Sequence, residues 1–129
     1  MSKYAQAAVD IVKRCQNAQS PDLKSEWDKS MMEMYPNQEP ARTKSCPRNA
    51  FLGLCESGMV AGISKESYGV SEGNRNKRYA VKAAHLVLDG QTDKKAIWES
   101  VREKAKTPNS QVDIVLAINL AGLLRHSRK

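Results

Sequence analysis

The sequence predicts an all-α protein folded as a single compact domain. Its 129 residues are enough for one hydrophobic core and too few for two ordinary domains. Aromatic residues make up only 5%, so the core depends on Leu, Val, Ile, Ala and Met, a composition that favours helices over a sheet. Apolar residues recur at helical spacing in several segments, and no segment shows the sustained alternation of a strand. We expect about six helices.

The first two helices are expected to form a pair over residues 1–35. Apolar side chains recur on one face of the segment Lys3–Ala18, which predicts the first helix. Ser20 is a good N-cap and Pro21 a good first residue for the second helix, which ends near Tyr35 before a proline. The apolar stripe of this second helix consists of Leu23, Trp27, Met31 and Met34.

Residues 36–45 are predicted to form a loop, because they contain two prolines and almost no apolar side chains. The third helix follows, with Ser45 or Cys46 as its cap and Pro47 as its first residue. Its C-terminus is expected at Gly58, because a glycine followed by two apolar residues commonly ends a helix. Nearly every face of this helix is apolar, which predicts that it is buried.

The fourth and fifth helices are bounded by capping residues. Asn74 is the expected N-cap of the fourth helix, which spans Arg75–Leu88 and ends at an Asp-Gly pair. The fifth helix begins at Thr92 or Asp93 and extends to Thr107, before a proline. Its inward-facing residues are Ile97, Trp98 and Val101.

The sixth helix resembles the third. Asn109 or Ser110 caps it, and it ends at Gly122. When Gly58 is aligned with Gly122, both helices show a polar start, an apolar middle and two apolar residues after the glycine. Either an internal repeat or the shared chemistry of two helix ends explains this match. In both cases we expect two buried helices at the centre of a core over residues 46–124.

The net charge of +7 is unevenly distributed. Residues 1–40 hold five Lys or Arg and six Asp or Glu, whereas residues 41–129 hold 16 and eight. The basic segments are "NRNKR" and the tail over residues 125–129, whose cations are Arg75, Lys77, Arg78, Arg125, Arg128 and Lys129. A basic surface attracts nucleic acid or an acidic protein partner. A charge of this size also keeps a small domain soluble without any partner.

The first basic segment is the predicted binding surface. Positive charge at a helix start opposes the helix dipole, and a local preference broken in this way points to function. Arg75 and Arg78 lie one turn apart and can share a phosphate or an acidic patch. Tyr68 and Tyr79 flank the segment and can stack on bases, although Tyr79 fits the core stripe equally well. The alternative is an ordinary solvated helix start.

Cys46 is the candidate for chemistry, as the centre of a small enzyme or a thiol sensor. A helix start and neighbouring cations favour the thiolate. A nucleophilic cysteine also needs a base and an orienting group, and only His85 and His126 are available, neither in a known motif. His85, on a mostly apolar helix, is expected at the core or its boundary. Cys15 and Cys55 lie on apolar helix faces and are expected to be inert.

The sequence indicates a cytoplasmic protein that uses no cofactor and no metal. Three cysteines without CxxC spacing are typical of reduced thiols, and they form no metal-ligand set with the two histidines. No apolar run approaches 18 residues, and the N-terminus lacks the features of a signal peptide. No nucleotide-binding or hydrolase motif is present. A binding or adaptor module is therefore favoured over an enzyme.

A structural or oligomeric role is the third hypothesis. Met31, Met32 and Met34 cluster on the second helix. Methionine side chains adapt to irregular partner surfaces, so this cluster is a candidate interface between proteins. The sequence leaves the oligomeric state open.

Three blocks of the sequence resemble a family of small uncharacterised bacterial α-helical proteins. They are "CPRNAFLGLCESGMVAGI", "NKRYAVKAAHLVL" and "NSQVDIVLAINLAGLL". Members show a CP-x-NAF-x-GLCE-x-G block, a later N-x-x-YA helix and a closing NSQ-x-D-V helix. Some are similar to reading frames carried on mobile integron gene cassettes. The resemblance covers residues 45–124 and implies no established activity.

The resemblance marks a set of polar positions rather than a mechanism. They are Cys46, Asn49, Asn76, Tyr79, Asn109, Ser110, Gln111 and Asp113. Asn49 and Asp113 are also equivalent when the third and sixth helices are aligned. We expect these polar residues to cap the starts of the two core helices, each reaching across to the other.

Overall fold

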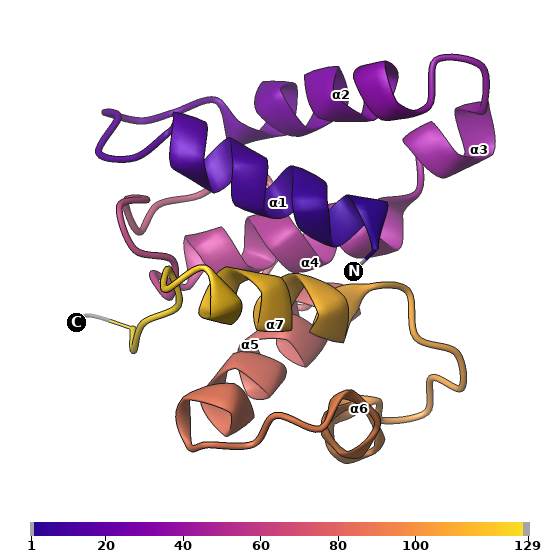
Figure 1. Cartoon of the computed structure of the whole chain (residues 1–129), viewed down its shortest axis with the longest axis vertical. Helices are drawn as coiled ribbons and strands as arrows, with labels where there is room; N and C mark the ends of the chain where they lie inside the picture. The colour runs from indigo at the N-terminus through magenta and orange to yellow at the C-terminus, as the bar shows by residue number, and fades with distance from the viewer. Residues whose placement is uncertain (1, 128–129) are drawn as a thin grey trace.

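The computed structural model describes residues 2–127 and confirms an all-α single domain (Figure 1). The helices are α1 (Lys3–Arg14), α2 (Leu23–Met34), α3 (Glu39–Arg42), α4 (Ser45–Glu56), α5 (Arg75–Leu88), α6 (Lys94–Val101) and α7 (Gln111–Leu120). Within the described range the only β-type pairing is one isolated bridge. No helix in this part of the chain combines the length and apolar character that spanning a membrane requires.

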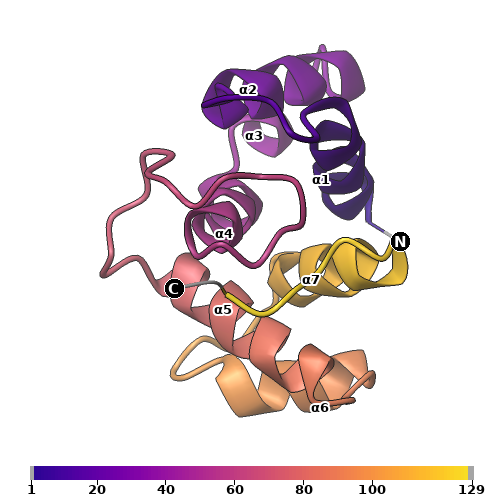
Figure 2. The same cartoon turned by 90° about the vertical axis from the view of Figure 1, so that its left-hand side faces the viewer.

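The helices form three levels (Figures 1 and 2). α2 and α3 lie at the top with α1 below them, α4 and α7 lie in the middle, and α5 and α6 lie at the bottom. α4 packs on α5, α7 and α2, while α7 packs on α1, α5, α4 and α6. The two helices predicted to be central therefore touch most of the other elements.

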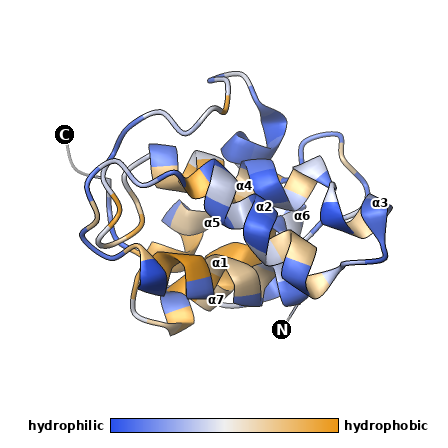
Figure 3. Cartoon of the chain, turned by 90° about the horizontal axis from the view of Figure 1, so that it is seen from above, coloured by the Kyte–Doolittle hydropathy of each residue, from blue (hydrophilic) through white to orange (hydrophobic). Residues whose placement is uncertain are grey.

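The core is not confined to residues 46–124. Ala5, Ala8, Ile11 and Val12 of α1 are fully buried, because α1 packs along α7. Apolar residues gather where these two helices lie together (Figure 3). The helical core that the sequence placed over residues 46–124 therefore also includes α1, which contributes one of its walls.

Helix α2 begins later than its capping residues predicted. The carboxylate of Asp22 accepts a hydrogen bond from the backbone N–H of Ser25, so Asp22 is the N-cap. Ser20 has a φ of +44° and is part of the preceding turn. The expected cap at Ser20 is therefore wrong, because its positive φ differs from the extended backbone that an N-cap residue usually adopts.

Other helix positions also differ from expectation, and α1 ends at Arg14 rather than near Ala18. α3 is a single turn within the predicted loop, started by Glu39 and Pro40. α4 begins at Ser45 with Lys44 as its N-cap, and its proline occupies an early position where a backbone N–H has no helical partner. α6 stops at Val101 rather than near residue 107, because Glu103 takes a φ of +50° that no helix can contain.

The ends of α4 and α7 pair with each other. Gly58 and Gly122 have φ values of +81° and +77°, as expected for glycines that end helices. Beyond them Val60 and Leu124 form the isolated antiparallel bridge, with hydrogen bonds Ala61 N–H to Leu123 O (2.7 Å) and Arg125 N–H to Met59 O (2.9 Å). When the two helices are aligned at Gly58 and Gly122, the residues that pair in this bridge occupy equivalent positions. The contact is therefore symmetric about a local two-fold axis.

Candidate functional site

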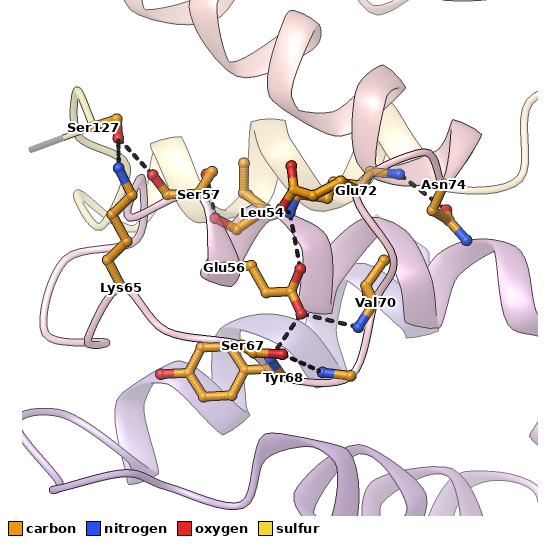
Figure 4. Close-up of polar contacts among 12 residues, drawn as sticks. Leu54, Glu56, Ser57, Lys65, Ser67, Tyr68, Val70, Glu72, Asn74 and Ser127 are labelled. Atoms are coloured by element: carbon orange, nitrogen blue, oxygen red, sulfur yellow. Dashed lines mark hydrogen bonds and ion pairs between the residues drawn. The ribbon is translucent and has the colours of Figure 1, made fainter. Parts of the chain in front are cut away.

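The most extensive buried polar contact is centred on Glu56, the last residue of α4 (Figure 4). Its Oε2 accepts hydrogen bonds from the backbone N–H groups of Tyr68 (2.7 Å) and Val70 (2.9 Å), and its Oε1 accepts one from Lys77 Nζ (2.9 Å). Burial disfavours the charged carboxylate, but these hydrogen bonds outweigh it and lower the pKa of Glu56. Glu56 thus attaches the α4–α5 loop, residues 57–74, to the core through these hydrogen bonds.

Lys77 does not lie on the basic surface that the sequence predicted. Only 8% of the residue is exposed, and its Nζ also contacts Glu72 Oε1 at 2.8 Å. Burial lowers the pKa of Lys77, but its bonds to the two glutamates prevail and raise it. A Cβ on Gly53 would lie 2.5 Å from Lys77 Cβ, so the absence of a side chain on α4 makes room for the lysine. Helical periodicity around the basic segment gave no sign of this partner.

Arg78 is also neutralised within the fold. Its Nε and Nη2 bond to the carboxylate of Glu103 at 3.0 and 2.9 Å, and its Nη1 bonds to the carbonyl of Gly73. The hydrogen bond from Arg78 is the main cause that lowers the pKa of Glu103 to about 2, and Lys82 adds to it. Of the three cations predicted in this segment, only Arg75 is exposed and without a carboxylate partner among residues 2–127.

The two tyrosines beside the basic segment are unavailable for stacking on bases. Tyr68 and Tyr79 are 7% and 3% exposed. The hydroxyl of Tyr68 donates a hydrogen bond to the Ser64 carbonyl at 2.6 Å. The rings of Tyr79 and Trp98 pack edge-on, with their centroids 5.6 Å apart. Both rings therefore belong to the core.

The basic tail folds back onto the end of α4. Arg125 Nε donates to the carbonyl of Gly58 at 3.2 Å, and Arg125 is half-buried. Arg128 and Lys129 lie outside the described residues. Arg125 is thus part of the contact between the two helix ends.

The polar positions marked by the resemblance connect α5, α6 and α7. Gln111 is 2% exposed; its Oε1 accepts from the backbone N–H of Asn109 (2.6 Å), and its Nε2 donates to Asn76 Oδ1 (3.1 Å). Asp113 pairs with Lys94 Nζ at 2.7 Å. Asp113 therefore pairs with α6, and no hydrogen bond joins it to Asn49 in the described part of the chain, so the expected capping contact between the two is absent there.

Ser110 is at the predicted N-cap of α7 but does not cap it through its side chain. Its φ of +68° places it in the left-handed region. A non-glycine residue in this conformation carries a small strain. The helix start is held instead by Gln111 and by the ion pair of Asp113.

Cys46 is half-buried at the second position of α4. His85 and His126 are exposed, and within the described range no hydrogen bond joins either of them to Cys46. The expected place of His85 at the core boundary is therefore wrong, since it lies on the solvent face of α5. No three His, Cys, Asp or Glu side chains of residues 2–127 are placed to hold a metal ion.

The three thiols are expected to differ in reactivity. Burial raises the pKa of the Cys15 and Cys55 thiols, and both residues are buried, whereas Cys46 reaches solvent. A disulfide reagent added to the native protein should therefore titrate one thiol quickly, and Cys46→Ser should abolish that phase. The unfolded protein should yield three thiols. Two fast thiols in the native state would contradict this arrangement.

The methionine cluster is largely part of the fold. Met31 is 1% exposed and Met34 is half-buried, whereas Met32 is 53% exposed. A single exposed methionine is ordinary for a protein surface, so the proposed methionine interface loses most of its side chains.

A hollow with a volume of about 480 Å³ lies between α6 and α7. We call it the α6/α7 cleft. Its lining residues are Asp93, Lys94, Lys95, Trp98, Glu99, Lys106, Pro108, Ser110, Val112 and Asp113. Sequence reasoning missed this site, although two of the marked polar positions, Ser110 and Asp113, lie in it. No local signal in the sequence pointed to the cleft, because Ser110 and Asp113 follow Trp98 by 12 and 15 positions.

The carboxylates around the α6/α7 cleft already have partners. Asp113 pairs with Lys94, and Glu99 pairs with Arg102 at 3.0 Å. Asp93 accepts a hydrogen bond from the backbone N–H of Lys95 as the N-cap of α6. In contrast, the ammonium groups of Lys95 and Lys106 contact no carboxylate within residues 2–127. The cleft therefore holds two lysines without a carboxylate partner, beside Asp93, which caps α6.

Comparison with known proteins identifies the family. Residues 1–125 match a family model described as "Family of unknown function (DUF6979)", and the chain belongs to this family. No curated protein and no solved structure matches the chain. The bacterial origin and gene-cassette setting that the resemblance implies stay predictions.

Proposed function

We propose that this protein is a cytoplasmic binding module whose partner is an acidic protein. The observation that carries the proposal is the positive charge of residues 75–106, which hold nine Lys or Arg against four Asp or Glu. Four of these cations, Arg75, Lys95, Lys104 and Lys106, have no carboxylate partner in the described part of the chain. All three thiols are free, which agrees with a reducing compartment.

The elements that carry these charges, which are α5, α6 and the segment after α6, lie at one end of the molecule. The Arg78–Glu103 ion pair brings the segment after α6 against the first turns of α5. This contact places the chain segments that carry Arg75 and Lys104 next to each other. α5 and α6 both lie at the opposite end from α2 (Figure 1). A partner with several carboxylates would meet this basic side first.

An acidic protein fits this side better than nucleic acid. Glu99 and Glu103 lie among the cations and would repel a continuous row of phosphates. The buried Tyr68 and Tyr79 remove the stacking surface that single strands use. A protein partner can place individual carboxylates beside Lys104 or Arg75 and avoid the two glutamates.

The test compares a labelled ten-residue peptide that carries three spaced glutamates with single- and double-stranded oligonucleotides, at about 50 and 200 mM salt. We expect the peptide to bind more tightly than either oligonucleotide, and its affinity to fall as salt rises. Arg75→Glu with Lys104→Glu should weaken peptide binding at least tenfold. Lys24→Glu is the matched control, because Lys24 is exposed on α2 far from this side.

Two results would count against the proposal. Tighter binding of an oligonucleotide would favour the nucleic-acid alternative. If neither probe binds at the lower salt concentration, the basic side serves only solubility.

A further inference from the structure

We infer that the α6/α7 cleft recognises an apolar side chain adjoining an acidic one in the partner's segment. This inference rests on the proposed function and adds the site and the sequence character of the ligand. The shape of the cleft, its apolar walls and its two unpaired lysines each contribute one part of the argument.

The cleft has the size and composition of a binding site. Its volume of about 480 Å³ falls within the roughly 300–1,000 Å³ range of sites that enclose small ligands or side chains. Trp98, Pro108 and Val112 provide apolar walls. Trp98 is only 6% exposed and packs edge-on with Tyr79, so this wall is formed without a ligand. An apolar side chain placed here would gain contacts without deforming the fold.

The charges at the cleft select for an acidic neighbour. Lys95 comes from the start of α6 and Lys106 from the segment that leads to α7, so two elements supply the unpaired cations. A ligand carboxylate between them would complete their pairing as Asp113 does for Lys94. A longer run of negative charge would meet Asp93 and Glu99, which line the same cleft and would repel it. One or two carboxylates beside an apolar group is therefore the chemistry that fits.

Trp98 supplies a direct readout of the site. The chain has two tryptophans, and Trp27 is fully buried against Phe51 on the α2 side, with ring centroids 5.4 Å apart. The indole N–H of Trp27 has no partner within residues 2–127, so Trp27→Phe removes no hydrogen bond. In that variant all tryptophan emission comes from Trp98 in the wall of the cleft.

The experiment titrates the full-length Trp27→Phe protein with three capped peptides, Glu-Glu-Leu-Leu, Glu-Glu-Ser-Ser and Gln-Gln-Leu-Leu. We expect Glu-Glu-Leu-Leu to shift the Trp98 emission and to bind at least tenfold more tightly than either of the others. Lys95→Gln with Lys106→Gln should reduce its affinity at least tenfold. Lys24→Gln should leave it unchanged. All of these lysines are exposed, so the variants should fold.

The outcomes separate this inference from the proposed function. If Glu-Glu-Ser-Ser binds as tightly as Glu-Glu-Leu-Leu without changing the Trp98 emission, the cleft is not the site and the acidic partner still stands. Equal binding of Gln-Gln-Leu-Leu would show that charge is not read at the cleft and would overturn the inference. If no acidic peptide binds at low salt, the proposed function fails together with it.

Discussion

Glu56→Ala is expected to destabilise the protein by about 3 kcal/mol, the cost of removing one partner from a buried ion pair. The side chain of Glu56 is 5% exposed and that of Lys77 is 10% exposed. The substitution leaves Lys77 with only the exposed Glu72, and it leaves the backbone N–H groups of Tyr68 and Val70 without an acceptor. Urea unfolding at pH 7 measures the loss. The α4–α5 loop should also become more susceptible to proteolysis, because its main attachment is gone.

Glu72→Gln is the matched control. Glu72 contacts the same Lys77 ammonium at 2.8 Å, but its side chain is 92% exposed. Solvent screens such a contact, so we expect a loss of less than about 0.5 kcal/mol. Equal losses for the two variants would show that burial does not set the strength of this network. If Glu56→Ala does not fold, Glu56→Gln keeps the shape and one acceptor and provides the comparison.

The pH dependence of stability follows from the same carboxylate. Because the pKa of Glu56 is lower in the folded state than in the unfolded state, its contribution is fully present above the unfolded value of about 4.3. The contribution is lost as the pH falls below that value and through the folded pKa. Wild-type protein should therefore lose more unfolding free energy between pH 5 and acid than Glu56→Ala does. Parallel curves for the two proteins would exclude this linkage.

Gly53→Ala is expected to destabilise the protein by about 2–3 kcal/mol through overpacking. In an unconstrained helix the same change stabilises by about 1 kcal/mol, because alanine is the better helix former. At this position the new Cβ would lie 2.5 Å from Lys77 Cβ and 2.9 Å from Lys77 Cα. The second of these atoms is backbone, so α4 and α5 must move apart and the Glu56–Lys77 contact lengthens.

Gly73→Ala separates this effect from a general response to losing a glycine. A Cβ on Gly73 would have nothing within 4 Å, and its φ does not require glycine. We expect its unfolding free energy to stay within about 0.5 kcal/mol of wild type. A Gly53→Ala protein as stable as wild type in urea would show that the two helices can separate at little cost.

Helix α5 shows what local sequence can determine. Its span over residues 75–88 and its N-cap were predicted correctly, because Asn74 accepts hydrogen bonds from the N–H groups of Asn76 and Lys77 within one turn. The glycine that ends α4 was predicted for a similar reason, since a positive φ is a property of that residue's own backbone. Such features depend on neighbours a few residues apart.

The basic segment shows where that reasoning fails. Lys77 pairs with Glu56, which is 21 positions away in the sequence, and Arg78 pairs with Glu103, which is 25 positions away. The residues next to Lys77 and Arg78 in the sequence do not predict these partners. From the sequence alone, a charged residue at a helix start is expected to be exposed, because burying a charge is unfavourable without a partner. The partner becomes known only from the tertiary structure. The α6/α7 cleft was missed for the same reason, because its lining comes from two helices and the segment between them.

The sequence by itself determined the all-α class, most helix boundaries, the two glycine-ended helices and the excess of positive charge in the later part of the chain. These properties follow from side-chain periodicity, capping and composition, which act over short distances along the chain. Only the tertiary structure decided which cations are neutralised, which tyrosines are buried and where a cleft opens. Those outcomes depend on contacts between distant segments, and the free energy of a charge is set by its burial and its partners rather than by its position in the sequence.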